Sequence, residues 1–410
     1  MSEWHIMTCE YPPQIGGVSD YTKLVALGLA EAGDEVHVWA PPAAEGGQCE
    51  GHREKGEEQR AKNEGSKHES SCVTHHSSRA TVHRELGKFR PSDLRRAGKQ
   101  LDRFPAPRRL LVQWVPHGYG YLSMNLPFCF WLWRRAKLKG DIVELMVHEP
   151  YLTFGEGSWK QSAVAFVHRL MTLTILNSAS CVWMSIPAWE SRLRPYALGR
   201  RVAFEWIPIP SSVPVVADGE GVRAARSRYA CNGNLLVGHF GTGEPHIKTQ
   251  LLVAITALFR KHPDAQLLFM GRGSDLLINE LTDNAPELAG KIRATGWLPL
   301  NDLSLHISAC DLMLQPYPDG ISSRRTSAMA GLSHGVPLIT TTGHLTEPLW
   351  AASNAVALAP LDGISDLPAL TANLLSDSSE RERMGTVAKR LYSERFDIRH
   401  TIAALRAGRT

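Results

Sequence analysis

The pattern of strand, glycine-containing loop, amphipathic helix and second strand occurs twice in this chain of 410 residues and restricts its fold most strongly. In the first copy, apolar residues 4–8 precede the loop YPPQIGGVSDY, a helical apolar period that stops at Gly33, and the strand EVHVWA. In the second copy, NLLVGHF precedes GTGEPHIKTQ, an amphipathic helix and the strand QLLFM. Strands that alternate with helices build parallel sheets. The sequence therefore predicts an α/β fold with two doubly wound, Rossmann-like domains.

Composition is typical of a folded protein that binds small anions. Hydrophobic residues make up 43% of the chain and charged residues 21%, and the length is sufficient for two cores. The formal net charge is +4 and the isoelectric point is near 8.6. A balance of this size suits anionic small ligands or a membrane surface and is too weak to indicate nucleic acid. We therefore expect no nucleic-acid partner.

Cysteine spacing and apolar segments predict a cytoplasmic protein. The seven cysteines include no C-x-x-C pair, so they do not form a disulfide framework. The first residues lack a basic start followed by an apolar run, and no signal peptide is visible. The most apolar long window, residues 163–180, contains His168 and Arg169, which favours a buried helix over a membrane span.

Two stretches of biased composition divide the chain. Residues 41–79 are rich in Gly, Glu, Lys and His and nearly free of apolar side chains, so we expect a disordered insertion. Its cysteines and histidines match no common metal-ligand spacing, and we predict no metal site there. The run PSSVPVVADGEG indicates an interdomain linker. The predicted domains are 1–210 and 211–375, followed by C-terminal helices at 376–410.

The segment 314–342, LQPYPDGISSRRTSAMAGLSHGVPLITTT, carries the strongest functional signal. It indicates the end of a strand, a Pro/Gly turn, a helix that opens in hydroxyls and arginines, and a second apolar strand. A helix start supplies free backbone N–H groups, and hydroxyl and guanidinium groups add donors that suit a phosphate or diphosphate. The donors at this predicted helix start are Ser322, Ser323, Arg324, Arg325 and Thr326.

This segment resembles the nucleotide-sugar-binding segment of retaining glycosyltransferases of family 4, which have the GT-B fold. In that family an acidic residue after the first strand is followed eight positions later by a second acidic residue, and then by a Gly-x-Pro strand. Here Asp319 occupies the first acidic position, Ser327 the second, and GVPLITT the closing strand. The family's glutamate at the second position holds the donor ribose, so Ser327 departs from the pattern. The resemblance covers nearly the whole chain outside residues 41–79.

The resemblance implies two domains that face each other across a cleft, with a nucleotide-sugar donor on the C-terminal domain and an acceptor on the N-terminal one. Gly16 and Gly17 match the family's N-terminal loop, and His148 matches a histidine that faces the transferred sugar. Lys248 matches, within one residue, a lysine that clamps the donor diphosphate, and Leu298 lies in a loop that holds the nucleobase.

The arginine that shares this clamp in the family has no counterpart at its usual position, and we expect Arg324 or Arg325 to replace it. Glu347 follows the GVPLITTT strand, where relatives carry an acidic residue near the sugar. A carboxylate that satisfies backbone donors at a helix start is the other interpretation of Glu347.

Together these residues predict metal-independent transfer of a sugar with retention of its anomeric configuration. Asp319 and His148 are expected to position the sugar. The chain contains no Asp-x-Asp pair, and fixed cations with helix N-termini can stabilise the departing diphosphate. No metal site and no cofactor besides the nucleotide-sugar substrate is expected. The acceptor implied by the resemblance is a glycan or a lipid-linked molecule.

The aromatic and basic segment 127–140, PFCFWLWRRAKLKG, has two interpretations. It is either a peripheral contact with anionic lipid at the inner face of the membrane or a core helix whose solvated end is basic.

Three other functions can be compared with glycosyl transfer. A sugar-nucleotide epimerase with this fold would need acid and base residues that the sequence does not reveal. A dinucleotide oxidoreductase is disfavoured because neither loop forms a G-x-G-x-x-G motif with an acidic residue about twenty positions further on. A catalytically degenerate scaffold that binds sugar nucleotides is consistent with Ser327 and the missing loop arginine.

Overall fold

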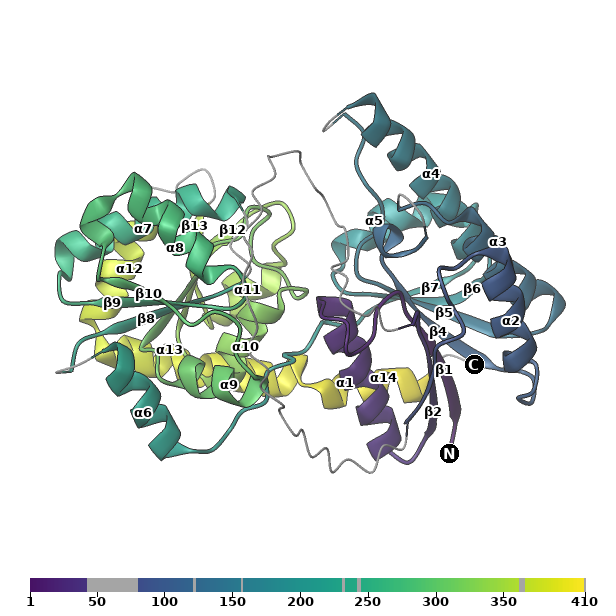
Figure 1. Cartoon of the computed structure of the whole chain (residues 1–410), viewed down its shortest axis with the longest axis horizontal. Coiled ribbons are helices and arrows are strands. Elements are labelled where there is room, and N and C mark those ends of the chain that lie inside the picture. The colour runs from purple at the N-terminus through teal and green to yellow at the C-terminus, as the bar shows by residue number, and fades with distance from the viewer. Residues whose placement is uncertain are drawn as a thin grey trace, which may run out of the picture.

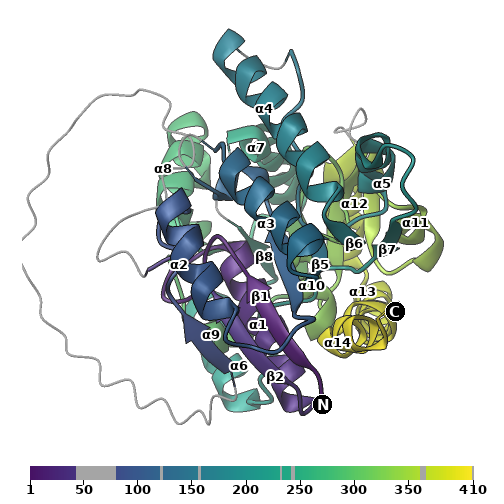
Figure 2. The same cartoon turned by 90° about the vertical axis from the view of Figure 1, so that its right-hand side faces the viewer.

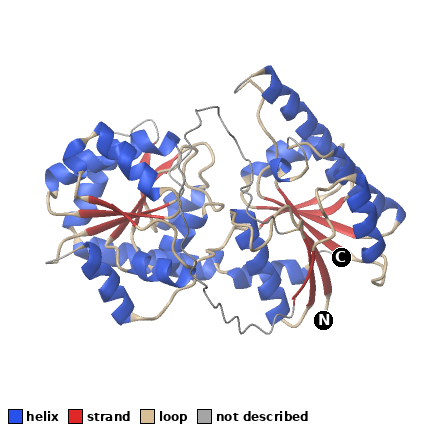
Figure 3. Ribbon diagram, viewed as in Figure 1, coloured by secondary structure: helices blue, strands red, loops and turns tan. Residues whose placement is uncertain are grey.

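The structure is a computed structural model that describes residues 1–42, 80–120, 123–155, 158–230, 233–241, 245–360 and 366–408. The predicted insertion at 41–79 lies almost entirely outside the described residues. The described part forms two α/β units that stand side by side (Figures 1 and 3), as the two glycine-loop patterns predict.

The N-terminal domain is built on a seven-stranded sheet in which every pairing is parallel, in the order β3-β2-β1-β4-β5-β6-β7. The chain begins in the middle of the sheet, at β1, and the strand order reverses between β1 and β4, where a doubly wound sheet binds its ligands. The strands are β1 (Glu3–Met7), β2 (Glu35–Trp39), β3 (Ala80–His83), β4 (Arg109–Trp114), β5 (Ile142–Val147), β6 (Ala179–Met184) and β7 (Ala203–Trp206). The helices are α1 (Gly17–Glu31), α2 (Pro91–Leu101), α3 (Leu126–Leu138), α4 (Trp159–Leu176) and α5 (Ala188–Leu193).

The C-terminal domain repeats this design on a six-stranded parallel sheet in the order β10-β9-β8-β11-β12-β13. Its strands are β8 (Leu236–Phe240), β9 (Gln266–Met270), β10 (Ile292–Ala294), β11 (Leu312–Gln315), β12 (Leu338–Thr342) and β13 (Ala357–Pro360). Its helices are α6 (Gly219–Tyr229), α7 (Pro245–Lys261), α8 (Ser274–Asn284), α9 (Leu300–Ser308), α10 (Thr326–His334), α11 (Pro348–Ser353), α12 (Asp366–Ser376) and α13 (Ser378–Leu391).

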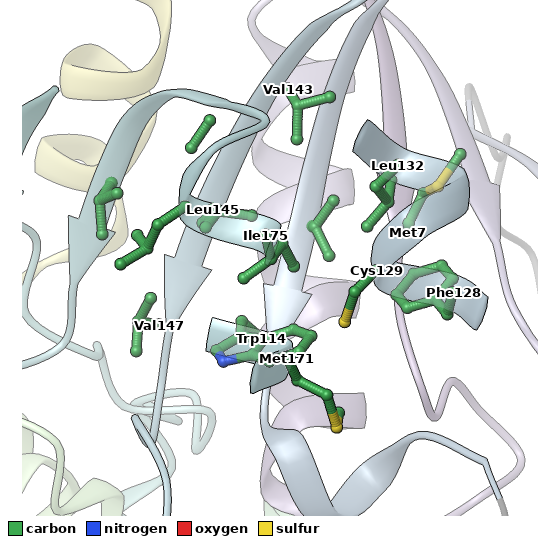
Figure 4. Packing of buried hydrophobic residues seen from close by; sticks show 14 of the residues in the cluster. Met7, Trp114, Phe128, Cys129, Leu132, Val143, Leu145, Val147, Met171 and Ile175 are labelled. Atoms are coloured by element: carbon green, nitrogen blue, oxygen red, sulfur yellow. The ribbon is translucent and has the colours of Figure 1, made fainter. Parts of the chain in front are cut away.

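Each sheet is covered on both faces by apolar side chains, which explains why the strands read as continuous apolar runs. Figure 4 shows part of the N-terminal core, where strand residues of β4 and β5 meet the inner faces of α3 and α4. The labelled side chains there include Trp114, Val143, Leu145, Phe128, Leu132, Met171 and Ile175. This packing fixes the strand ends from which the site residues project.

The last helix, α14 (Ile398–Ala407), returns to the first domain and lies beside α1 (Figures 1 and 2). Gly28 of α1 leaves room for Ile402, because a Cβ atom at residue 28 would lie 2.8 Å from that side chain. Arg406 pairs with Asp34 at 3.0 Å, and Arg109 donates to the backbone oxygen of Leu405 at 2.7 Å. The chain thus crosses between the domains twice, after β7 and after α13.

The expected buried helix over residues 163–180 is only half correct. The second half of α4 is buried against the sheet, but the first half extends beyond the body of the domain (Figures 1 and 2). Trp159 is 78% exposed and Phe166 57% exposed. The prediction of burial was wrong for the first half of α4 because its apolar residues lie on an outer face of the helix as well as on an inner one. Among the described residues, no helix is long and apolar enough to cross a membrane.

Candidate active site

A cavity of about 1190 Å³ lies between the two domains, at the carboxyl ends of the strands β1, β4 and β5. Its walls come from the loops after these strands, from α4, and from the segment that precedes α10. The edge at which these strands end is where open α/β sheets bind ligands. Five of the residues predicted from sequence line this cavity: Gly16, Gly17, His148, Arg324 and Thr326.

The glycine pair forms the start of α1 on the cavity wall. Gly16 is the N-cap residue, and a Cβ atom there would lie 2.2 Å from the carboxylate oxygen Oε1 of Glu10. That oxygen accepts a hydrogen bond from the backbone N–H of Ser19 at 2.9 Å. The cavity wall at this helix start therefore already carries a carboxylate, and a side chain at residue 16 would displace the carboxylate of Glu10.

His148 follows β5 and is held by a residue that sequence reasoning missed. Its Nε2 lies 2.9 Å from Oε1 of Gln113, and its ring meets Tyr21 edge to face at a centroid distance of 5.0 Å. Burial lowers the pKa of His148 to about 3, so the imidazole is neutral at neutral pH. A neutral ring that donates from Nε2 to an amide oxygen keeps Nδ1 as a hydrogen-bond acceptor. The sequence offered one signal for Gln113, a polar residue near the end of an apolar strand.

The helix expected to open at Ser322 begins instead at Thr326, so this prediction was wrong by about one turn. Residues 322–325 stay non-helical because Ser323 is used to join the domains. Its hydroxyl donates to the backbone oxygen of Ser185 at 2.8 Å and accepts from Nε1 of Trp206 at 3.1 Å. Its backbone oxygen accepts from the N–H of Ile209 at 2.9 Å. A helix that started at Ser322, four residues earlier, would remove these contacts.

Arg324 and Arg325 converge on Asp319. Nη2 of Arg324 lies 2.9 Å from Asp319 Oδ2, and Nη2 of Arg325 lies 3.1 Å from the same oxygen. Arg324 also reaches Glu149 of the N-terminal domain at 3.3 Å, so this guanidinium group bridges the cleft. The side chains of Arg324 and Arg325 are 16% and 21% exposed and do not extend into bulk solvent.

The turn at Gly320 places Asp319 beneath these arginines. Gly320 has φ of +82°, and a Cβ atom there would lie 2.1 Å from the backbone nitrogen of Gly343. Only glycine fits this position without strain or clash. The backbone oxygen of Asp319 accepts from the N–H of Leu345 at 3.1 Å. The turn is therefore fixed by the loop that follows β12.

Ser327, at the second acidic position of the motif, is bound to its own domain. Its hydroxyl lies 2.7 Å from the hydroxyl of Tyr317, and the guanidinium group of Arg325 sits over the Tyr317 ring at 4.8 Å. Among the described residues, Ser327 does not line the cavity. Its contact with a donor ribose stays a prediction.

Asp319 and Arg325 also lie off the described cavity lining, and so do three further residues predicted to bind the donor. Lys248 forms an ion pair with Glu280 of α8. Leu298 packs against the core cluster that surrounds α10. Glu347 is 7% exposed, and its carboxylate accepts hydrogen bonds from Ser323 and from Nε1 of Trp350. The donor contacts of these three residues remain predictions.

The position of Glu347 matches the predicted helix start, since it is the N-cap residue of α11. Its side chain does not cap that helix's own backbone but instead holds the backbone N–H of Ser323 at 2.9 Å. Glu347 therefore lies behind the cavity wall and supports the segment that carries Arg324 and Arg325.

No cluster of three or more His, Cys, Asp or Glu side chains able to hold a metal ion occurs in the described parts of the chain. The charged groups and imidazoles that the described residues bring to the cavity are the guanidinium group of Arg324, the ammonium group of Lys160, two carboxylates and two histidines. Phosphate groups pair with guanidinium groups in a bidentate manner, so Arg324 can bind an anionic ligand by giving up its contact with Glu149.

Comparison with known proteins agrees with this architecture. Residues 235–377 match the family described as glycosyl transferases group 1. No curated protein sequence matches the chain. The structure is similar to that of sucrose-phosphate synthase from Thermosynechococcus elongatus, with a TM-score of 0.72 and 15% identity over 98% of this chain and 97% of that one.

Two further solved structures are similar over nearly their whole length. Anabaena HepE in complex with UDP-glucose has a TM-score of 0.64 and 14% identity over 98% of both chains. WaaG, a glycosyltransferase involved in lipopolysaccharide biosynthesis, has a TM-score of 0.64 and 12% identity over the full length of both chains. The protein therefore has the two-domain GT-B fold of these glycosyltransferases, and its C-terminal domain carries a glycosyl transferases group 1 match.

Proposed function

We propose that this protein transfers a sugar from a nucleotide-sugar donor to an acceptor with retention of the anomeric configuration, as family 4 enzymes do. The observation that carries the proposal is the convergence of Arg324, Arg325 and the start of α10 beside the interdomain cavity. Arg325 Nε is buried and has no acceptor of its own. Support also comes from HepE, whose structure holds UDP-glucose.

In the proposed reaction the bond between the sugar C1 and the diphosphate oxygen breaks, and a bond from C1 to the acceptor oxygen forms on the same face. The acceptor proton passes to the departing diphosphate oxygen. Negative charge grows on the diphosphate, and the two guanidinium groups with the N–H groups of α10 stabilise it. These fixed donors supply the role that a metal ion plays elsewhere, and the proposal requires no cofactor.

His148 and Asp319 have positioning roles in this scheme. Neutral His148, oriented by Gln113, accepts a hydrogen bond from a sugar hydroxyl through Nδ1. Asp319 accepts a hydrogen bond from each of the two arginines and so limits the directions of their remaining donors. Lys248 joins the clamp only if it leaves Glu280 when the donor binds.

A panel of UDP-, GDP- and ADP-sugars tests the proposal with the purified full chain. We expect one nucleotide to raise the melting temperature by several degrees, because a ligand that binds only the folded state stabilises it. We also expect slow release of free sugar from the matching donor, measured by chromatography. Binding without turnover would support the degenerate scaffold, and donor conversion without transfer would support the epimerase. Absence of both binding and turnover across the panel contradicts the proposal.

We also propose that α3 contacts an anionic membrane surface at the cytoplasmic face, which makes the protein peripheral to the inner side of the membrane. The outer side of α3 exposes Phe130 and Leu138 beside Arg134, Lys137 and Lys139. This combination inserts apolar side chains while cations meet lipid phosphates.

Vesicle sedimentation tests this contact. The chain is expected to bind vesicles containing phosphatidylglycerol, in a salt-sensitive manner, and not vesicles of phosphatidylcholine alone. Phe130→Glu should weaken binding at least threefold, whereas Leu276→Glu, at an exposed apolar residue of α8, should not. Equal binding to both lipid types would show that α3 has no such role.

A further inference from the structure

The candidate active site continues into an arm formed by α4. The same cavity that contains His148 and Arg324 is also lined by one face of the first half of α4. The α4 residues that line it are Trp159, Lys160, Ala163, Val164 and Val167, which recur at helical spacing. At about 1190 Å³ the cavity exceeds the roughly 300–1,000 Å³ typical of a pocket for one small molecule. Space therefore remains for a second ligand beside the donor sugar.

The described lining of this arm is mainly apolar. Ala163, Val164 and Val167 of α4 line it together with Met124, and Lys160 is the one charged side chain among the α4 residues that line it. Two nearby polar side chains that do not line the arm are engaged elsewhere. Nε2 of His168 lies 2.7 Å from the backbone oxygen of Ser123. Arg169 donates to two backbone oxygens and lies over the ring of Phe154 at 3.7 Å. A glycan would find few hydrogen-bond partners here, whereas a hydrocarbon chain would lose only water.

The other end of the cavity is polar. Glu10, His117 and Glu149 line it beside His148. His117 Nδ1 lies 3.5 Å from Glu149 Oε2, so carboxylate and imidazole groups gather where the acceptor hydroxyl must approach the sugar. One continuous cavity thus has polar groups at the reaction centre and an apolar arm along the first half of α4. That half of α4 is the part that protrudes from the domain in Figures 1 and 2.

From this polarity we propose that the acceptor is an amphiphile, with a hydroxyl-bearing polar head beside His148 and a hydrocarbon chain in the α4 arm. The inference rests on the proposed sugar transfer and deepens it by assigning the acceptor class. Trp159, which lines the arm, is 78% exposed, and this allows a hydrocarbon chain to enter the arm from a lipid surface. The hydrocarbon chain bound in the arm is part of the acceptor, and the lipid surface only delivers the acceptor.

Binding of a series of alkyl glucosides tests the proposal, each used below its critical micelle concentration. Calorimetry with the whole polypeptide and a saturating nucleotide is expected to show Kd falling about fourfold for each added methylene, from methyl to octyl glucoside. Ala163→Glu places a carboxylate in the arm at an exposed helical position and should abolish this chain-length dependence. Phe166→Glu changes the neighbouring face of α4, outside the cavity lining, and should leave the dependence unchanged.

Each outcome separates this inference from the proposed function. A Kd independent of chain length, or a dependence that survives Ala163→Glu, overturns the amphiphilic acceptor. If both variants lose the dependence of Kd on alkyl length, the hydrocarbon chain adsorbs on the outer face of α4. This result also overturns the amphiphilic acceptor. A change of oligomeric state in Ala163→Glu, measured by light scattering, would instead make this face a contact between two copies.

Donor turnover gives the independent readout. Donor hydrolysis without chain-length dependence keeps the transferase proposal and removes the acceptor assignment. Chain-length dependence without donor turnover keeps the assignment of an amphiphilic ligand and removes the transferase proposal.

Discussion

Replacing Arg324 and Arg325 by alanine together is expected to weaken donor binding by about 100-fold or more. A hydrogen bond to a charged group contributes roughly 1.5–3 kcal/mol, and at least two such bonds to the diphosphate are lost. Each single variant should lose about tenfold, and Arg325→Lys should recover only part of the affinity because an ammonium group lacks the guanidinium fork. Calorimetric titration with the preferred nucleotide diphosphate measures these effects.

The double variant should remain folded, which makes its binding result interpretable. Asp319 and Glu149 lose their cations, but their side chains are 35% and 46% exposed and can be solvated. Arg383→Ala is a matched control, because Arg383 forms an exposed pair with Glu380 of the same helix, far from the cavity in sequence and structure. An unchanged Kd in the double variant would contradict the anion site.

Lys248→Ala belongs in the same series. The described contact of Lys248 is with Glu280, so this variant distinguishes a clamp of arginines alone from one that recruits the lysine when the donor binds. A loss as large as that of a single arginine variant would support recruitment.

The fold was predictable because it depends on local patterns. The glycine loops and alternating apolar segments predicted β1, α1 and β2 in one domain and β8, α7 and β9 in the other, and the structure confirms two parallel sheets. These patterns act within about 40 residues, where periodicity and turn chemistry reflect secondary structure directly. The GT-B architecture follows once two such units are joined.

The site was predictable only in part because its contacts connect distant segments. Periodicity placed a helix start at Ser322, but Ser323 binds Ser185 and Trp206, more than 100 residues earlier in the chain. Gln113 orients His148 from a neighbouring strand, and that pairing depends on the order of strands in the sheet. Sequence reasoning identified residue types suited to anions, whereas their partners depended on how the two domains meet.

The exposed half of α4 illustrates the same limit. Its apolar residues indicated burial, yet one face lines the cavity and another faces solvent. A face of an apolar helix is buried only where a neighbouring element covers it, and composition alone does not reveal which element that is.

The second large effect concerns Glu347, whose replacement by alanine is expected to destabilise the C-terminal domain by about 4 kcal/mol. The buried carboxylate accepts from the N–H of Ser323 at 2.9 Å and from Nε1 of Trp350 at 2.7 Å. Alanine leaves both donors buried and unsatisfied, and each lost bond to a charged acceptor costs roughly 1.5–3 kcal/mol. Glu347→Gln keeps one acceptor oxygen and should lose about half as much. Urea denaturation followed by tryptophan fluorescence measures the free energies of unfolding.

The same substitution should also weaken donor binding, although Glu347 does not line the described cavity. Ser323 is held by Glu347 on one side and by the N-terminal domain on the other, and it directly precedes Arg324. Releasing Ser323 allows the arginine to leave its position at the cleft, so we expect Kd for the nucleotide to rise about tenfold in the fraction that remains folded. Glu382→Ala, at an exposed position of α13, is the control for loss of a carboxylate. If Glu347→Ala lowered stability and left Kd unchanged, Glu347 would be a purely structural residue, and Arg324 would be held in place by Asp319 and Glu149 alone.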